Sequence, residues 1–151
     1  MGTMHNNKIG LAGELRVMSE LLLRGHNPAK SYLEEGVDLV LQNGLRIEVK
    51  SGHRCHSDTW GKAHRVTNNY LFTLRGGKRK FPQNLENCDF VILWCIDDDC
   101  FLIIPKKQIT GTCVGICKIS DEGKGKYIQY KNKWDLLEVK DESTNRSDDC
   151  S

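Results

Sequence analysis

Apolar residues recur with a helical period in the first part of the chain. Between Lys8 and Arg24 they return at intervals of four, three and four residues, which places them on one face of an α-helix. Asn6 or Asn7 can cap the start of such a helix, and Gly25 is suited to end it. We therefore predict one helix over this stretch. Its core-facing stripe would consist of Leu11, Leu15, Met18 and Leu22.

Glu14 falls on this apolar stripe, three residues after Leu11 and four before Met18. A carboxylate that faces a protein core must be paired with a cation, bind a metal or lie beside an opening. Glu20 lies off the stripe and is expected in solvent. Glu14 is therefore the first candidate for a functional side chain.

Three short strand patterns follow the helix, at Ala29–Leu33, Val37–Gln42 and Leu45–Lys50. Asn43 and Gly44 separate the last two and form a strong hairpin signal, because both residues tolerate positive φ. These two strands and their turn are the clearest local structure that the sequence predicts.

Side-chain alternation brings three charged residues of this hairpin together. In the second strand, Leu45, Ile47 and Val49 point to one face, so Glu48 and Lys50 point to the other. In the first strand, the apolar face is predicted to hold Val37, Leu39 and Leu41, which leaves Asp38 on the polar side. Asp38, Glu48 and Lys50 are therefore expected to converge near one end of the hairpin.

The remaining chain predicts more strands and little helix. A near-continuous apolar run at Cys88–Ile96 is typical of a strand covered on both faces. Lys106–Ile109 predicts a helical turn, and Trp134–Val139 is expected to pack back onto the domain. The fold class is thus α/β (α+β), a mixed central sheet flanked by helices. Further strands are predicted at Arg65–Arg75, Cys100–Ile104 and Lys126–Tyr130.

Length and composition restrict the class of protein. A chain of 151 residues suits one domain, predicted at residues 1–140, and the acidic tail 141–151 is predicted to be disordered. No apolar run approaches the ~20 residues of a membrane span, and the N-terminus does not resemble a signal peptide. The seven cysteines show no regular spacing, which favours reduced thiols and a cytoplasmic location. Four of them are expected to be buried: Cys88, Cys95, Cys113 and Cys117.

The net charge of +2 hides a strongly basic segment. Residues 50–80 contain eight lysines and arginines and a single acid, Asp58, which gives +7. Trp60, Tyr70 and Phe72 are interleaved with these charges and offer stacking surfaces beside phosphate-binding groups. This segment favours a nucleic-acid partner, although a solvated surface loop has the same composition.

The converging trio suggests chemistry at phosphate. Two carboxylates at one sheet end, Asp38 and Glu48, form a hard oxygen site that suits Mg²⁺, with Mn²⁺ as a substitute. The ammonium group of Lys50, two residues further on, can position an attacking water or neutralise charge on phosphorus. Glu14 can supply a third carboxylate.

At these residues the sequence resembles the PD-(D/E)XK nuclease superfamily. The matching segments are Gly13-Glu14, Gly36-Val37-Asp38 and Ile47-Glu48-Val49-Lys50, in the order helix, strand, strand, strand. The resemblance is clear over residues 8–51 and is most like the small group I intron homing endonucleases and the Holliday-junction resolvases. It implies a restriction-endonuclease-like core, magnesium-dependent hydrolysis of double-stranded DNA, and a homodimer or homotetramer.

Carried over residue by residue, the resemblance implies that Asp38 and Glu48 bind the metal, Lys50 is the catalytic cation and Glu14 is an accessory ligand. Val37 stands where the family name has proline, and the second core helix of the family is not evident in residues 52–65. Neither an organic cofactor nor a membrane partner is expected. Nucleic-acid contacts are predicted at Ser51, His53, Arg54, Lys62, Arg65, Arg75, Lys78, Arg79 and Lys80.

Other interpretations remain open. The same charged trio occurs as a plain surface ion pair in many proteins, and a non-catalytic nucleic-acid-binding protein can share the fold. A structure-specific nuclease of the junction-resolving kind is a further alternative. A zinc site that combines the segment His53-Arg54-Cys55-His56 with Cys113 and Cys117 is disfavoured, because paired C-x-x-C spacing is absent.

Overall fold

The computed structural model describes residues 2–32, 36–57, 65–74, 87–117, 119 and 125–138. Within them the chain forms one α-helix, α1 (Gly2–Leu23), at its N-terminal end. Short 3₁₀ segments are η2 (Ile96–Asp98), η3 (Lys106–Gln108), η4 (Ile128–Tyr130) and η5 (Trp134–Leu137). The strands are β1 (Ala29–Lys30), β2 (Leu39–Val40), β3 (Arg46–Gly52), β4 (His56–Ser57), β5 (Arg65–Val66), β6 (Asn69–Thr73), β7 (Phe90–Cys95), β8 (Cys100–Pro105) and β9 (Cys113–Cys117).

The central sheet is mixed, as the sequence predicts. Its five strands lie in the order β1-β2-β3-β7-β8, and only the β3–β7 pair is parallel. The turn at Asn43 and Gly44 joins β2 and β3, with Gly44 at φ +85° and a Leu41 N–H bond to the Leu45 carbonyl of 2.9 Å. The predicted hairpin is therefore confirmed, although β2 is shorter than expected. β3 occupies the centre of the sheet.

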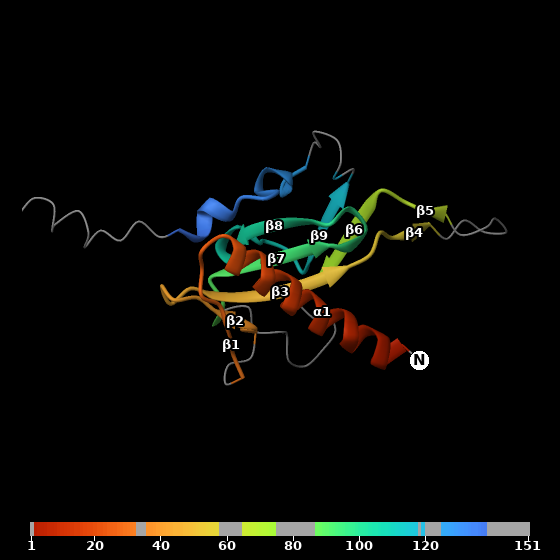
Figure 1. The fold of residues 1–151 in the computed structure, drawn as a ribbon. Helices are drawn as coiled ribbons and strands as arrows, with labels where there is room; N and C mark the ends of the chain where they lie inside the picture. The colour runs from red at the N-terminus through yellow and green to blue at the C-terminus, as the bar shows by residue number, and fades with distance from the viewer. Residues whose placement is uncertain are drawn as a thin grey trace, which may run out of the picture.

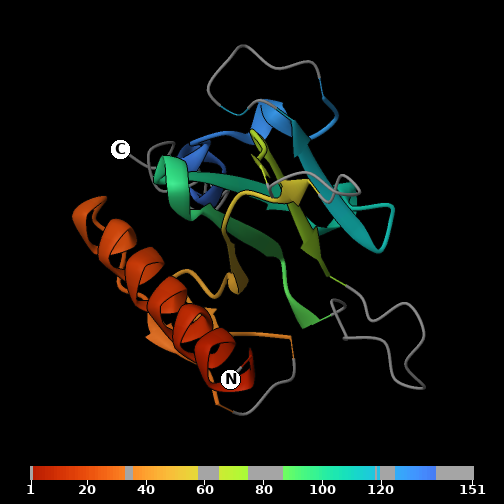
Figure 2. The same cartoon turned by 90° about the vertical axis from the view of Figure 1, so that its right-hand side faces the viewer.

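Two layers cover the central sheet, one on each face (Figures 1 and 2). Helix α1 and η5 lie against one face, where Val17 and Leu21 pack with Ile92 and Ile103. The antiparallel pair β6–β9 lies against the other face. Its inward residues include Tyr70, Phe72, Val114 and Ile116, which pack on Val91, Leu93, Leu102 and Ile104. Successive side chains of β7 thus pack into the cores on opposite faces of the sheet, which confirms that this strand is covered on both sides.

Helix α1 differs from its prediction in the face that it buries. Val17 and Leu21 have no exposed surface, whereas Leu11, Leu15 and Leu22 are each about half exposed. The predicted stripe is thus wrong as a core face, because the helix carries apolar residues on two sides. The helix also begins at Gly2, before the predicted caps, and the chain leaves it through Gly25 at φ +90°.

Several other expectations need correction. The predicted strand Lys126–Tyr130 is absent, and its last three residues form the 3₁₀ segment η4. β9 is a strand that the sequence pattern did not reveal. Cys113 and Cys117 are exposed on β9, while Cys88 and Cys95 are buried as predicted. The six described cysteines are all free thiols. The acidic tail 141–151 lies outside the described residues, and none of the described helices is long and apolar enough to cross a membrane.

A turn of three aspartates joins β7 to β8 and binds three different parts of the protein. Asp97 accepts a hydrogen bond from the backbone N–H of Arg54 (2.6 Å), just after β3. Asp98 accepts one from the hydroxyl of Tyr70 on β6 (2.6 Å). Asp99 pairs with Arg16 of α1, Oδ2 to Nη2 at 3.1 Å. The pKa of all three carboxyl groups is lowered, that of Asp97 by the Arg54 amide, that of Asp98 first by the Arg54 side chain and then by Tyr70, and that of Asp99 by Arg16. The bonds fix the helix, β3 and β6 relative to one turn.

Candidate active site

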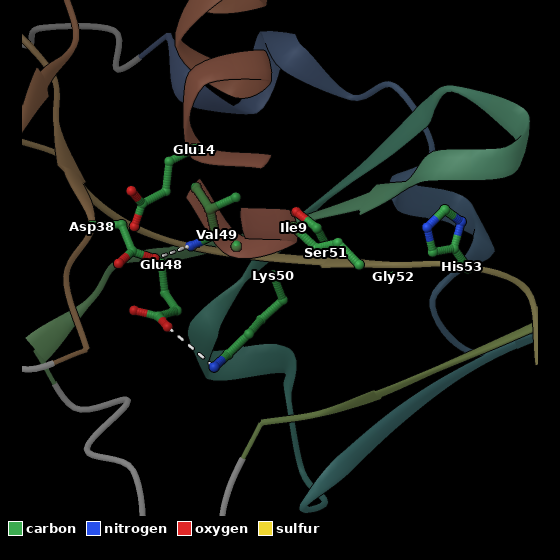
Figure 3. A pocket seen from close by; sticks show the side chains of 10 residues that line it. Ile9, Glu14, Asp38, Glu48, Val49, Lys50, Ser51, Gly52 and His53 are labelled. Atoms are coloured by element: carbon green, nitrogen blue, oxygen red, sulfur yellow. Dashed lines mark hydrogen bonds and ion pairs between the residues drawn. The ribbon is translucent and has the colours of Figure 1, made fainter. Parts of the chain in front are cut away.

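An open pocket of about 500 Å³ lies where α1 approaches the β2–β3 hairpin. Figure 3 shows the side chains of Glu14, Asp38, Glu48 and Lys50 grouped in it, from the helix, the start of β2 and the middle of β3. The predicted convergence of these residues is therefore confirmed. The remaining lining residues are Ile9, Gly10, Val49, Ser51, Gly52 and His53.

Asp38 is held by the backbone of the neighbouring strand. Its Oδ2 accepts a hydrogen bond from the N–H of Val49 at 2.8 Å, and its own N–H donates to the carbonyl of Ile47 at 2.8 Å. Both bonds depend on the β2–β3 register, in which Leu39 pairs with Ile47. The hairpin turn therefore determines where this carboxylate stands relative to Glu48 and Lys50.

Glu48 is the buried acid of the group, with only 8% of its surface exposed. It lies on β3, which is hydrogen-bonded to β2 on one side and to β7 on the other. Its Oε1 stands 3.4 Å from Nζ of Lys50, two residues along the same strand face. A buried carboxylate requires such a partner, because an uncompensated charge away from water is costly.

Glu14 enters the pocket from α1 and has a partner that the sequence did not suggest. Its Oε2 lies 3.3 Å from Nζ of Lys30 on β1. The ammonium group of Lys30 also lies 5.6 Å from the ring centre of Tyr32, a strongly exposed aromatic residue. No sequence motif points to Lys30. It comes near Asp38 and Glu14 because β1 pairs Lys30 with Leu39, the residue after Asp38. The pocket is therefore lined by three carboxylates and Lys50, and Lys30 pairs with Glu14 from outside this lining.

The pKa values of the three carboxyl groups are all raised from their ordinary range. Burial is the first cause for each of them. The negative charge of Glu48 raises the pKa of Asp38 further, and Asp38 does the same to Glu14 by hydrogen bonding and charge. Lys50 and Lys30 act in the opposite direction on Glu48 and Glu14. Three acids thus share one partly desolvated site with an excess of negative charge, a condition that favours a bound cation.

The donor chemistry of this group fits a hard divalent ion, although a full ligand set is not assembled. Among the described residues, no three His, Cys, Asp or Glu side chains are arranged to hold a metal ion. Two acids, Glu14 and Glu48, are instead paired with lysines. Mg²⁺ is commonly bound by one or two carboxylates with water in its other positions, so Asp38 and Glu48 suffice as protein ligands. The same observation disfavours zinc at His53, Cys55 and His56.

Ser51 follows Lys50 and lines the pocket, but its hydroxyl is turned toward the helix. Ser51 Oγ is buried and has no hydrogen-bond partner among the described residues. A Cβ atom added at Gly13 would stand 1.7 Å from this oxygen and 2.9 Å from Ser51 Cβ. Only glycine permits this approach of α1 to β3. Gly13 is therefore a determinant of the site that the sequence pattern did not identify as such.

The predicted nucleic-acid contacts after Ser51 lie in four different places. His53 borders the pocket, and its Nδ1 lies 2.9 Å from Asp97. Arg54 is bound to Asp98, with Nε donating to Oδ2 at 3.1 Å, so its guanidinium group already has a structural partner within the protein. Arg65 lies on β5, without a described side chain. The other predicted contacts, Lys62, Arg75, Lys78, Arg79 and Lys80, lie outside the described residues.

Comparison with known proteins finds similarity at the level of the fold. No protein-family model matches the chain, and no curated protein sequence matches it significantly. Among solved structures, the fold is similar to that of a bacterial homing endonuclease, I-Ssp6803I, with a TM-score of 0.60 and 18% sequence identity. The match covers 87% of this chain and 91% of the other. At this identity the likeness shows a shared fold, that of a nuclease, over nearly the whole length of both chains.

Proposed function

We propose that this protein is a metal-dependent endonuclease of the PD-(D/E)XK superfamily that hydrolyses phosphodiester bonds of double-stranded DNA. The observation that carries the proposal is the convergence of Asp38, Glu48 and Lys50 in one open pocket. The fold adds support, since its structural neighbour is named as a homing endonuclease. The basic composition of residues 50–80 supports DNA as the substrate.

Asp38 and Glu48 are the proposed ligands of Mg²⁺ or Mn²⁺, with Glu14 as an accessory ligand. When bound, the ion supplies a Lewis acid that neutralises phosphate charge and lowers the pKa of water. The chain itself holds both carboxylates in fixed positions. Asp38 is anchored to the Val49 amide, and Glu48 is buried in the sheet, so neither carboxylate needs to reorganise when substrate arrives.

Lys50 is the proposed catalytic cation. Its ammonium group reaches Glu48 from the same strand face, so it stands at the edge of the carboxylate group. From there it can hold an attacking water by hydrogen bonding and stabilise the negative charge that grows on the phosphate oxygens. Lys30 pairs with Glu14 as Lys50 pairs with Glu48, and it offers a second positive charge to the phosphate backbone. Both lysines also reduce repulsion among the acids in the free protein.

One chain contains one such pocket in its described part, whereas cutting both strands of a duplex requires two. A homodimer or homotetramer is therefore part of the proposal, with a symmetry that matches the two strands. Homing or restriction-like cleavage of duplex DNA is the favoured activity, and resolution of branched DNA is the alternative within the same chemistry. A panel of duplex and four-way-junction substrates distinguishes them by where the cuts fall.

The second candidate is a non-catalytic DNA-binding protein. It is favoured by one observation, the pairing of Glu14 and Glu48 with lysines, which would let the acids serve only as ion-pair partners. Such a protein would bind DNA with a strong dependence on salt but would neither bind Mg²⁺ nor cleave.

The test is nicking of supercoiled plasmid in Mg²⁺ or Mn²⁺, with DNA affinity measured separately in EDTA. Asp38→Asn and Lys50→Met should each reduce the nicking rate by at least about 100-fold, as loss of a charge-stabilising group does in other enzymes. Both should remain folded and bind DNA about as tightly as the wild type does. Two matched variants should nick at the wild-type rate: Glu20→Gln, on α1 outside the pocket, and Lys107→Met, exposed on η3. A wild type that binds DNA without nicking would favour the second candidate.

A further inference from the structure

Two side chains at the edge of the central sheet stand next to the pocket without lining it. Lys30 lies on β1, and Tyr32 follows two residues later. The pairing of β1 with β2 continues through Ser31, whose N–H donates to the carbonyl of Asp38 at 2.9 Å. The edge strand is therefore bound to the residue that supplies one carboxylate of the pocket. We call Lys30 and Tyr32 the rim.

The ammonium group of Lys30 has two contacts of different kinds. Its Nζ lies 3.3 Å from Oε2 of Glu14 and 5.6 Å from the ring centre of Tyr32. The ion pair is partly exposed, at 27% for the Lys30 side chain and 22% for that of Glu14, and Tyr32 is exposed by 82%. The distance to the ring is within the range of a cation–π contact. Lys30 therefore lies between the acids of the pocket and an aromatic surface that is open to solvent.

Of the two lysine–glutamate pairs described at the site, that of Lys30 is the one that can separate at low cost. Glu48 is buried, and its partner Lys50 lies on the same strand face, so parting them would leave a charge away from water. Glu14 and Lys30 come from different elements, α1 and β1, and both reach solvent. When the ammonium group leaves Glu14, the ring of Tyr32 can still stabilise it.

We propose that the rim is a second binding site for the DNA backbone, and that Lys30 becomes available to phosphate when a divalent cation binds the carboxylates. The inference rests on the proposed function and adds a link between its metal and its DNA. Glu14 and Asp38 interact by a hydrogen bond, so a cation bound to Asp38 competes with Lys30 for Glu14. The displaced ammonium group then needs a new counter-ion, and phosphate is the one that the substrate supplies.

The balance of charge favours the same coupling. In the free protein the three carboxylates of the pocket exceed the two lysines paired with them, so the group carries net negative charge and repels phosphate. A divalent cation reverses the sign of this group. Metal and DNA should therefore each strengthen the binding of the other, as the reciprocity of coupled equilibria requires. We assign a share of this coupling to Lys30, and that share should be lost with its ammonium group.

The test is the affinity for a labelled DNA duplex with and without Mn²⁺, measured by fluorescence anisotropy. All proteins carry Lys50→Met, which leaves the three carboxylates in place and keeps the duplex uncut. The coupling factor is Kd in EDTA divided by Kd in Mn²⁺. Lys30→Met should lower this factor about two- to fivefold, the effect expected from one partly exposed ion pair. The loss should come from weaker binding in Mn²⁺, with little change in EDTA.

Lys107→Met is the matched control, because it removes the same charge from an exposed position on η3, outside the pocket. It should leave the coupling factor unchanged. In Mn²⁺, Lys30→Met should also flatten the plot of log affinity against log salt concentration by about 0.9, the slope of one phosphate contact. Tyr32→Leu should lower the coupling factor in part, whereas Tyr32→Phe, which keeps the ring, should not.

Two results would overturn the inference while the proposed function stands. One is a coupling factor for Lys30→Met equal to that of Lys107→Met. The other is an equal loss of affinity in EDTA and in Mn²⁺, which would make Lys30 an ordinary contact. A duplex that binds the Lys50→Met protein equally well in EDTA and Mn²⁺ would contradict the proposed function itself, and the inference with it. Equal coupling factors in Tyr32→Leu and Tyr32→Phe would overturn the part assigned to the aromatic ring. Circular dichroism melts establish that each variant is folded.

Discussion

The contact between Gly13 and Ser51 makes a sharp prediction about stability. Alanine is normally better than glycine inside a helix, by about 0.5–1 kcal/mol. At Gly13, however, the added Cβ would stand 1.7 Å from Ser51 Oγ and 2.9 Å from Ser51 Cβ. Rotation of the serine side chain can move Oγ but not Cβ, so α1 must shift. Overpacking of this kind costs about 1–3 kcal/mol, which reverses the sign of the substitution.

Gly10 supplies the matched control, because it lies on the same helix and a Cβ there would meet nothing within 4 Å. We expect Gly10→Ala to raise the melting temperature and Gly13→Ala to lower it. The gap of about 2–3 kcal/mol corresponds to roughly 5–10 °C for a domain of this size. Scanning calorimetry at one pH and salt concentration measures both variants.

Ser51→Gly, combined with Gly13→Ala, gives a double-mutant cycle, because it removes both atoms that a Cβ at position 13 would contact. The next neighbour of that Cβ would then be Trp94 Cε3 at 3.7 Å, an ordinary contact. Gly13→Ala should therefore be harmless or stabilising in the Ser51→Gly background, which appears as a positive coupling energy between the two positions. The reasoning is refuted if Gly13→Ala is as stable as Gly10→Ala in the native background.

Two further predictions concern charge in the pocket. Burial and the charge of Glu48 raise the pKa of Asp38 above its ordinary 3.8, so the folded state favours the protonated carboxyl group. The stability that this preference contributes is fully present below pH 3.8 and is lost as the pH rises through the folded-state pKa. In EDTA, the melting temperature of Asp38→Asn should therefore gain on that of the wild type between acidic and neutral pH, and a constant difference would contradict this. Lys30→Met removes the ammonium group that occupies Glu14, so Mn²⁺ should bind about fivefold more tightly in the absence of DNA, equivalent to about 1 kcal/mol. Isothermal titration calorimetry measures this, with Lys107→Met expected to match the wild type; an unchanged or weaker affinity would show that Lys30 does not compete with the ion.

The hairpin and its charged trio were predictable because they depend on short-range rules. Side-chain alternation has a period of two, and the turn at Asn43-Gly44 sets the register, so the faces of Glu48 and Lys50 follow from counting residues. Asp38 was placed correctly for the same reason. Val37 was not: it packs in the cluster beneath β6–β9, apart from Leu39, since β2 forms regular pairs only from Leu39 onward.

Other features depend on contacts between distant parts of the chain. The periodicity of α1 identified a helix but could not tell which of its two apolar sides faces the sheet, and it favoured the wrong one. β9 was missed because its run Cys113–Cys117 is short and has glycine at its centre; it becomes a strand by pairing with β6. Lys30 comes within reach of Glu14 only through the edge pairing of β1 with β2.

The carboxylates of the pocket and the lysines paired with them lie between residues 14 and 50, on α1, β1 and β3 and directly before β2. Two described segments after residue 53 support this unit: β7 pairs with β3 in the sheet, and the aspartate turn binds the helix through Asp99 and Arg16. The residues of the proposed site are therefore contiguous in sequence, whereas β7 and β8 supply the sheet core behind them. Substitutions at exposed positions downstream of His53 can change the outer surface and leave the proposed site residues unchanged. In the proposed nuclease, such substitutions would alter which DNA is bound without altering the residues proposed to cleave it.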